Sequence, residues 1–376
     1  MQKRALTALV TVLALVLLYL PEPGAAAGKP CRAYVLLEAR TGQLLLEENS
    51  SESLPMGTMA KLMTMLLTAE ALESGALSEN TAVTASPAAN AQKGASIWLM
   101  PGEKMTVGDL LRGMIIGNAN DASVALAEAV SGTEEQFVMD MNARGFELGL
   151  RSTVFTCASG LSEEGQVTTA ADLGRLCCKL TEYPVLTPYM TTWRTFLRGE
   201  QTELVNENTL VRSYDGLLGM KAGHGERTGY TLAAAAQRGD GIYVAVVLGC
   251  QEDADRFSIA KTLLSKGFGS YQVTTPAFSG EFLKPLQVLH GTDTAVEVEA
   301  QGLTGITVPK GNAGLQTVLV LPEYVEAPVS KGQQLGTAAF YQGDIYLYEV
   351  PLTAASSVPR LTFSRAFLRL LDNMLK

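Results

Sequence analysis

The chain is poor in histidine: among its 376 residues only His224 and His290 occur, far apart in the sequence. A histidine-based catalytic triad or a His-rich metal site is therefore not expected, and acid–base chemistry must fall to Lys, Asp or Glu. The five cysteines show no metal-type spacing, and the net charge of −9 gives no support to nucleic-acid binding. We therefore expect no metal, no cofactor and no nucleic-acid partner.

Charged residues are also scarce, at 18%, whereas hydrophobic residues make up 47% of the chain. This is the composition of a globular protein, and the length exceeds a single core of ordinary size. The sequence therefore predicts two domains.

The N-terminus has the pattern of a secretory signal, predicted here as residues 1–27. Lys3 and Arg4 precede an apolar run from Ala5 to Leu20, and Ala25-Ala26-Ala27 supplies small residues for cleavage. The alternative is an uncleaved membrane anchor, although the run is shorter than the ~20 residues that span a bilayer. We expect an exported protein at the extracytoplasmic face of the membrane or in the cell wall.

An apolar helix that follows Pro55 and Gly57 is the centre of the predicted domain. Its first turn carries Thr58 and Lys61, which are three residues apart and therefore lie on one face. A hydroxyl and an amine at the start of a buried helix are costly unless paired, and they are also the components of a nucleophile with a base beside it. By themselves, the two residues would more often be a helix cap and a solvated amine.

Strand patterns at both ends of residues 31–270 enclose a series of helix patterns. Hairpins are predicted near 33–47 and 229–249, and a short strand at Ser96–Leu99. Helices are predicted after caps at Thr106 and Thr133, over Thr169–Leu180, and over Asp253–Leu264. This order predicts an α+β domain, an antiparallel sheet whose two halves bracket a helical lobe.

The C-terminal part changes character. Residues 275–355 contain short strand patterns between turns and predict a small all-β domain. Residues 359–376 form an amphipathic pattern that fits a helix lying at a membrane surface. A helix docked on its own domain would show the same pattern, so both readings stay open.

Several further stretches resemble signatures of the D-alanyl-D-alanine carboxypeptidases, the low-molecular-weight penicillin-binding proteins, over nearly the whole exported chain. They are Leu54-Pro55-Met56, Asn120-Asp121-Ala122, Asn206-Glu207-Asn208-Thr209-Leu210 and Gly219-Met220-Lys221. The resemblance implies a serine β-lactamase/penicillin-binding-protein-like domain. It also implies a peptidoglycan stem peptide ending in D-Ala-D-Ala as substrate, and binding of β-lactams.

Such enzymes carry Ser-x-x-Lys, Ser-x-Asn and Lys-Thr-Gly motifs, and this sequence departs from each of them. The corresponding residues are Thr58 to Lys61, Asn118 to Asn120, and Lys221-Ala222-Gly223. The resemblance therefore implies Thr58, Lys61 and Asn118 at the catalytic positions. It implies Asn120, Lys221, Ala222 and Gly223 at the substrate-binding positions. Without the resemblance, Asn118–Asn120 would be a plain turn and Lys221–Gly223 an ordinary strand end.

The departures predict weak or absent catalysis. The Thr58 methyl group restricts χ1 and crowds attack, and the Asn118 amide cannot relay a proton as an alcohol does. Ala222 removes a hydroxyl donor to the substrate carboxylate. The alternatives are slow acylation by Thr58 and Lys61, or a non-catalytic wall protein that binds peptidoglycan or regulates a partner. A β-lactamase would share the motifs, but the C-terminal β domain argues against one.

Overall fold

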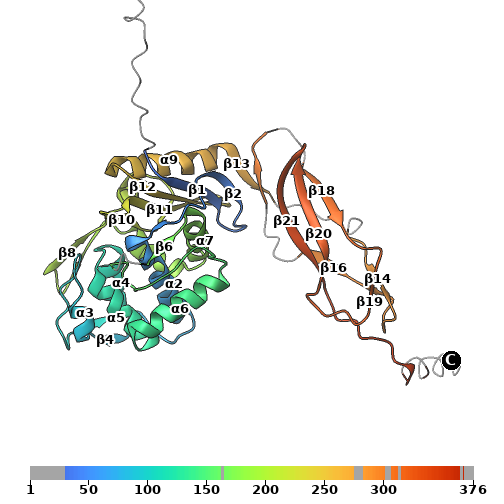
Figure 1. Cartoon of the computed structure of the whole chain (residues 1–376), viewed down its shortest axis with the longest axis horizontal. Helices are drawn as coiled ribbons and strands as arrows, with labels where there is room; N and C mark the ends of the chain where they lie inside the picture. Colours follow the sequence, from blue (N-terminus) through green and yellow to red (C-terminus); the bar gives the residue numbers. More distant parts are fainter. Residues whose placement is uncertain are drawn as a thin grey trace, which may run out of the picture.

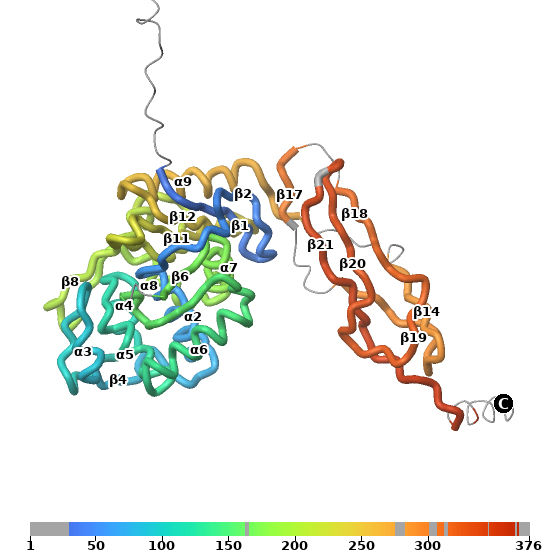
Figure 2. Tube along the Cα trace, viewed as in Figure 1, coloured from blue at the N-terminus to red at the C-terminus, as the bar shows by residue number. Residues whose placement is uncertain are grey.

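The computed structural model describes residues 30–161, 165–274, 283–300, 306–311, 315–364 and 367. Within these ranges the chain forms two domains, and the second begins where the last helix of the first ends (Figures 1 and 2). The predicted signal, 1–27, lies outside the described residues, as does most of the predicted tail helix, 359–376. None of the helices among the described residues has both the length and the hydrophobicity of a membrane-spanning segment.

An antiparallel sheet forms the frame of the first domain, with the strand order β10-β11-β12-β1-β2 and β9 paired to β11. The predicted hairpins are its centre: β11 and β12 pair from Arg238 and Gly241 outward, and β12 continues the sheet to β1. The strands are β1 (Ala33–Glu38), β2 (Leu44–Glu48), β9 (Leu217–Gly219), β10 (Ala222–Gly225), β11 (Gly229–Arg238) and β12 (Gly241–Cys250).

Both faces of this sheet are buried, because successive side chains in β11 and β12 point to opposite sides. Ala233 and Val246 contribute to the core shared with the helical lobe, whereas Leu232 and Val247 contribute to a second core beneath α9 (Asp253–Ser270). Helix α9 lies along the outer face of the sheet (Figure 1). The sheet therefore separates two cores, and its β10 edge faces the lobe.

The helical lobe packs around α2, whose residues from Lys61 to Ala69 are all buried. Three other helices begin as predicted, because the hydroxyls of Thr106, Thr133 and Thr169 accept hydrogen bonds from backbone N–H groups of their first turns. The main helices are α2 (Lys61–Glu73), α4 (Val107–Ile115), α5 (Asn120–Ser131), α6 (Glu134–Glu147) and α7 (Ala170–Leu180).

Short elements connect the sheet and the lobe. They are η1 (Gly57–Ala60), α3 (Pro87–Asn90), η2 (Pro184–Leu186), α8 (Thr187–Thr191) and η3 (Thr209–Arg212), with the strand pairs β3 (Leu54–Pro55) with β6 (Val167–Thr168), β4 (Ala82–Thr84) with β5 (Lys104–Thr106), and β7 (Arg194–Leu197) with β8 (Thr202–Val205).

Two local predictions are wrong. The expected strand at Ser96–Leu99 is a loop, because the N–H groups of Ile97 and Leu99 donate to the buried Asp121 carboxylate instead of to a strand. The last helix runs beyond Leu264 to Ser270. It continues through Gly267 because that glycine packs directly against the Tyr243 ring, where a Cβ would lie 3.0 Å from Cγ.

The second domain consists of β structure throughout its described part, as predicted. Its sheets have the orders β13-β17, β15-β14-β19 and β16-β21-β20-β18 around one apolar core. The strands are β13 (Tyr271–Thr274), β14 (Leu286–Leu289), β15 (Ala295–Val296), β16 (Val298–Ala300), β17 (Ile306–Pro309), β18 (Leu315–Val320), β19 (Tyr324–Glu326), β20 (Gln334–Gln342) and β21 (Ile345–Ala354).

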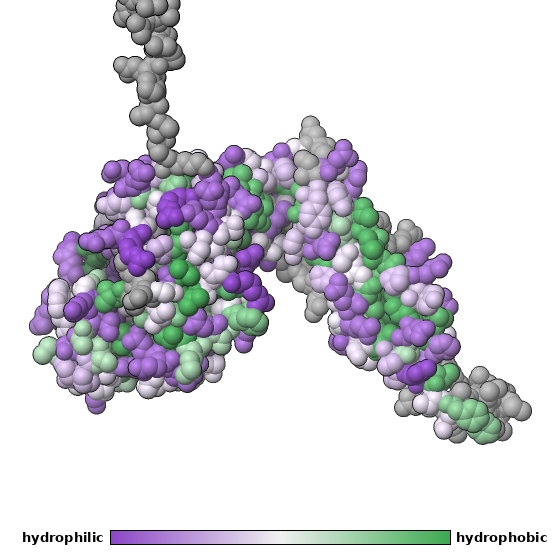
Figure 3. All heavy atoms as spheres, viewed as in Figure 1, coloured by the Kyte–Doolittle hydropathy of each residue, from purple (hydrophilic) through white to green (hydrophobic). Residues whose placement is uncertain are grey.

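The Gln43 side chain links the two domains. It donates to the Leu347 carbonyl at 3.2 Å and accepts from the Thr307 N–H at 3.3 Å. Apolar residues are visible along the second domain (Figure 3), where Val318 and Val320 of β18 are exposed. The β structure continues past Ala354 through isolated bridges such as Val329–Val358.

Candidate active site

Thr58 lies in η1, immediately before α2. The preceding Gly57 has a φ of +52°, and a Cβ there would lie 2.7 Å from the Thr228 methyl carbon, so this sharp turn requires glycine. The Thr58 hydroxyl is buried and has no hydrogen-bond partner among the described residues. It rests on the backbone of β10, where a Cβ at Gly223 would lie 1.8 Å from Thr58 Oγ1. The absence of a side chain at Gly223 therefore makes room for the Thr58 hydroxyl.

Lys61 opens α2 and is completely buried. Its Nζ donates to Asn120 Oδ1 at 2.7 Å and to the Ser159 carbonyl at 2.6 Å. Burial, and next the charge of Lys221, hold the pKa of Lys61 well below its ordinary value. The amine is therefore deprotonated more easily than that of an exposed lysine, and both of its hydrogen-bond acceptors are protein groups.

The turn between α4 and α5 brings the second motif beside Lys61. Asn118 has a φ of +57°, a left-handed conformation that asparagine tolerates better than most residues, and it is 6% exposed. Its Nδ2 donates to Glu207 Oε1 at 3.2 Å. Asn120 donates from Nδ2 to the Lys93 carbonyl at 2.7 Å while its Oδ1 holds Lys61. The amide of Asn120 therefore holds the Lys61 amine in place.

The third motif lies at the start of β10. Lys221 is buried and donates to the Ile115 carbonyl at 3.3 Å, which ties β10 to the end of α4. Burial lowers its pKa to about 8, with Arg256 adding to the decrease and Glu207 opposing it. Ala222 points elsewhere: its side chain belongs to the second core with Leu232, on the face of the sheet that α9 covers. The structure thus does not bring the Ala222 methyl group to Thr58.

Sequence reasoning gave no role to Glu207 and did not single out Arg256. Glu207 lies between β8 and η3, where it meets Asn118 and its charge reaches both Lys61 and Lys221. Arg256, in the first turn of α9, is 4% exposed and donates to the Gly223 carbonyl at 2.6 Å. The asparagines on either side of Glu207 were a sequence signal that this stretch belongs to the site. Arg256 gave no such signal, because it lies in a stretch with the pattern of an ordinary amphipathic helix.

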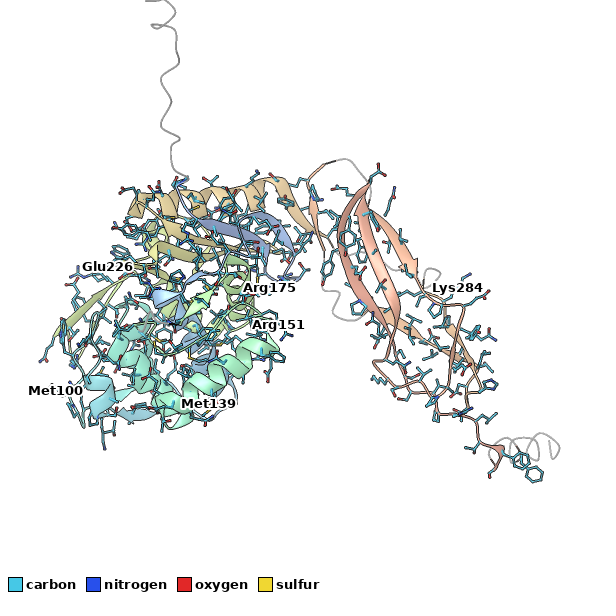
Figure 4. All side chains as sticks on the ribbon, in the orientation of Figure 1. Met100, Met139, Arg151, Arg175, Glu226 and Lys284 are labelled. Carbon is cyan, nitrogen blue, oxygen red and sulfur yellow. The ribbon has the colours of Figure 1, made fainter. Side chains whose placement is uncertain are left out.

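The end of β10 opens onto a cavity of about 350 Å³. His224 is exposed and lines it, and its ring stacks on Tyr230 with 5.9 Å between centroids. Glu226, labelled in Figure 4, lies in the turn that follows β10. His224 is therefore a surface residue beside the end of β10.

The structure brings together Thr58, Lys61, Asn118, Asn120, Lys221 and Gly223 from three separate parts of the chain. Three buried polar atoms here have no hydrogen-bond partner within the described ranges, namely Thr58 Oγ1, Asn118 Oδ1 and Glu207 Oε2. Native proteins pair nearly all such atoms, with protein, water or ligand. Among the described residues no group of His, Cys, Asp or Glu could hold a metal ion. The arrangement offers a hydroxyl, a buried amine with a lowered pKa and several hydrogen-bond acceptors.

Comparisons with known proteins agree with this geometry. Residues 25–252 match the sequence model of the family described as D-alanyl-D-alanine carboxypeptidase, and residues 271–360 match the C-terminal domain of penicillin-binding protein 5. The chain is 34% identical over 339 residues to D-alanyl-D-alanine carboxypeptidase DacF of Bacillus subtilis, covering 88% of this chain and 87% of the relative. It is 32% identical to DacC of Escherichia coli over 87% of this chain and 84% of the relative.

Solved structures give the same result. Penicillin-binding protein 5 from Haemophilus influenzae is similar with a TM-score of 0.79 and 26% identity, over 90% of this chain and all of that one (100%). Penicillin-binding protein D2 from Listeria monocytogenes, in its cefotaxime-bound form, is similar with a TM-score of 0.58 and 27% identity, over 64% of this chain and 97% of that one. The predicted family and fold are confirmed, and the chain belongs to the D-alanyl-D-alanine carboxypeptidase family.

Proposed function

We propose that this protein binds peptidoglycan stem peptides ending in D-Ala-D-Ala at the extracytoplasmic face of the cell, and that it cleaves them weakly or not at all. The observation that carries the proposal is the position of Thr58 Oγ1, which is buried against Gly223 and forms no hydrogen bond with Lys61. A binding or regulatory wall protein needs the site but does not need a competent nucleophile.

For acylation, the Thr58 proton would pass to Lys61 while Oγ1 formed an ester with the penultimate D-Ala carbonyl carbon. The terminal D-Ala would leave as an amine after gaining a proton, and water would later break the ester. The lowered pKa of Lys61 supports its role as the base. The hydroxyl is the weak part, since a small misplacement of a reacting atom costs roughly a hundredfold in rate.

The second motif adds a further loss. The Asn118 amide donates from Nδ2 to Glu207 and has a free acceptor oxygen. Neither its nitrogen nor its oxygen can pass a proton to the leaving amine as a hydroxyl does. Loss of a proton-transfer group typically removes roughly 10²–10⁴ in rate, although such effects do not add simply within one site. Slow acylation by Thr58 remains the second candidate, favoured by the retained base Lys61. If Thr58 is acylated slowly by the peptide, we expect β-lactams to acylate it slowly as well.

The deciding experiment is labelling of the purified ectodomain with a fluorescent penicillin, together with release of D-Ala from a stem peptide. We expect faint labelling and little release in the wild type, and a large gain of both in Thr58→Ser combined with Asn118→Ser. Ala222→Thr is then added separately, with a thermal melt, because position 222 lies in the second core. Strong wild-type labelling that Thr58→Ala abolishes would refute weak catalysis.

The location is part of the same proposal. The apolar run after Lys3 and Arg4 supports export through a signal, and the amphipathic residues 359–376 support contact with a membrane surface. Flotation of the mature chain with lipid vesicles, compared with a chain ending at residue 358, tests the tail. Equal recovery of both chains with the vesicles would remove the tail as the contact.

A further inference from the structure

Asn118 presents a buried oxygen that nothing in the described part of the protein satisfies. The side chain is 6% exposed, its Nδ2 donates to Glu207, and its Oδ1 has no hydrogen-bond partner. An amide can turn over and exchange its oxygen and nitrogen, so the partner decides which atom is left. An ionised carboxylate only accepts hydrogen bonds, so Glu207 fixes the Nδ2 group on its own side and leaves Oδ1 for a ligand.

Glu207 itself is held firmly. On one side, Asn206 donates from its backbone N–H to the Trp193 carbonyl at 2.8 Å. On the other, Asn208 is fully buried, and its side-chain oxygen accepts from the Leu210 N–H. The Asn206 side chain also accepts from the Asn208 N–H at 2.9 Å, which closes the turn around Glu207. The backbone on both sides of Glu207 is therefore held, and from it the carboxylate reaches the Asn118 amide.

Asn118 also lies between the two buried lysines. Lys221 bonds to the Ile115 carbonyl, three residues before Asn118, and Lys61 bonds to Asn120, two residues after it. The turn that carries Asn118 is thus anchored at both ends inside the site. Thr58 Oγ1 and Glu207 Oε2 are also buried and without a partner. A ligand that satisfies the two acceptor oxygens of Asn118 and Glu207 must bring hydrogen-bond donors.

We infer that Asn118, oriented by Glu207, makes the site select ligands with an amide N–H at their last linkage. In this chain Asn118 would then be a specificity-determining residue and Glu207 a positioning residue. The inference rests on the proposed function, because it assumes a stem peptide as the ligand. In a peptide ending in D-Ala-D-Ala the last linkage is an amide, and its N–H pairs with Asn118 Oδ1.

A depsipeptide ending in D-Ala-D-lactate is the discriminating probe, because an ester oxygen replaces that N–H. The ester loses the hydrogen bond and sets an oxygen against Asn118 Oδ1, which stays buried and unpaired. A buried group left unsatisfied costs enough to lower affinity by roughly 10–100-fold. The wild type should therefore bind the amide at least about tenfold more tightly than the ester.

Glu207→Gln tests the positioning role. A glutamine side chain can donate as well as accept, so Asn118 is free to turn and to present Nδ2 to the ester oxygen. We expect the preference for the amide to fall from about tenfold or more to within about threefold, mainly because the ester binds more tightly. A residue that only supported the fold would weaken both ligands equally. Glu226→Gln, an exposed glutamate in the turn after β10 (Figure 4), is the matched control and should keep the wild-type preference.

The experiment measures binding of N-acylated L-Lys-D-Ala-D-Ala and of its D-lactate analogue by calorimetry, with mass spectrometry to verify that neither is hydrolysed during the titration. Asn118→Ala is the second variant: it should weaken the peptide, which loses its acceptor, and tighten the ester, whose oxygen no longer faces Oδ1, so that the preference for the amide disappears. A wild type that binds both ligands equally, or prefers the ester, overturns the inference and leaves the proposed function standing. A wild type that binds neither ligand overturns both.

Discussion

Replacing Lys221 with methionine tests the electrostatics of the site through stability. Lys221 is 2% exposed, and burial is the largest cause that lowers its pKa from 10.5 to about 8. A shift of this size corresponds to about 3 kcal/mol of free energy between the charged and neutral forms. Methionine keeps most of the length and removes the buried charge, so the pH dependence due to Lys221 should disappear in the variant.

The direction follows from proton binding. Below about pH 8 both the folded and the unfolded chain carry the proton, and the buried charge destabilises the folded state. Between about pH 8 and 10.5 the folded chain has lost the proton while the unfolded chain still holds it. Because the unfolded state binds more protons, the free energy of unfolding rises with pH, by up to about 1.4 kcal/mol per pH unit.

The assay is urea unfolding of both chains from pH 7 to 10.5. We expect the wild type minus Lys221→Met difference in unfolding free energy to grow by about 3 kcal/mol over this range. Taking the difference removes the tyrosines and cysteines that titrate in the same interval. Lys261→Met changes a solvent-exposed lysine of α9 and should give a flat difference. A difference for Lys221→Met that stays flat or falls with pH would show that burial does not lower the pKa of Lys221 in the folded protein.

Two further changes probe how the site is held. Gly223→Ala would set a methyl carbon 1.8 Å from Thr58 Oγ1, so urea unfolding should show a loss of about 1–3 kcal/mol, whereas Gly269→Ala, with nothing within 4 Å, should show none. Equal effects at the two glycines would contradict the close approach. Asp121→Asn should cost about 3 kcal/mol, because the buried carboxylate accepts from the N–H groups of Ile97 and Leu99. Wild-type stability of that variant would show that these bonds are dispensable.

The fold was largely predictable because its signals are local. Threonine caps at 106, 133 and 169 and the alternating pattern of β11 and β12 determine elements that the structure reproduces. The failures have non-local causes. The backbone at Ile97 is diverted by a carboxylate 24 residues further along the chain, and Gly267 stays helical because the Tyr243 ring on another strand fills the space beside it. No local pattern reports such a partner.

The site was predictable to a different degree. The resemblance located Thr58, Lys61, Asn118 and Lys221, and the structure brings them together through Asn120 and Ile115. It did not indicate that Ala222 points into the second core, because strand alternation at the edge of a sheet depends on how β10 pairs with β11. The resemblance included Glu207 in a signature but gave it no role, which only its hydrogen bond with Asn118 reveals.

The hydrogen bonds distinguish two kinds of residue in the site: those bonded to the surrounding protein and those with polar atoms left unpaired. Lys61 is bonded to Asn120 and Ser159, and Lys221 to Ile115, so each retained lysine is part of the framework. At the altered positions, Thr58 Oγ1 and Asn118 Oδ1 have no partner in the described part of the chain. A hydroxyl that no framework group needs can be exchanged at little cost in folding. Thr58→Ser breaks no hydrogen bond among the described residues, so we expect it to change the free energy of unfolding by no more than about 1 kcal/mol in urea unfolding.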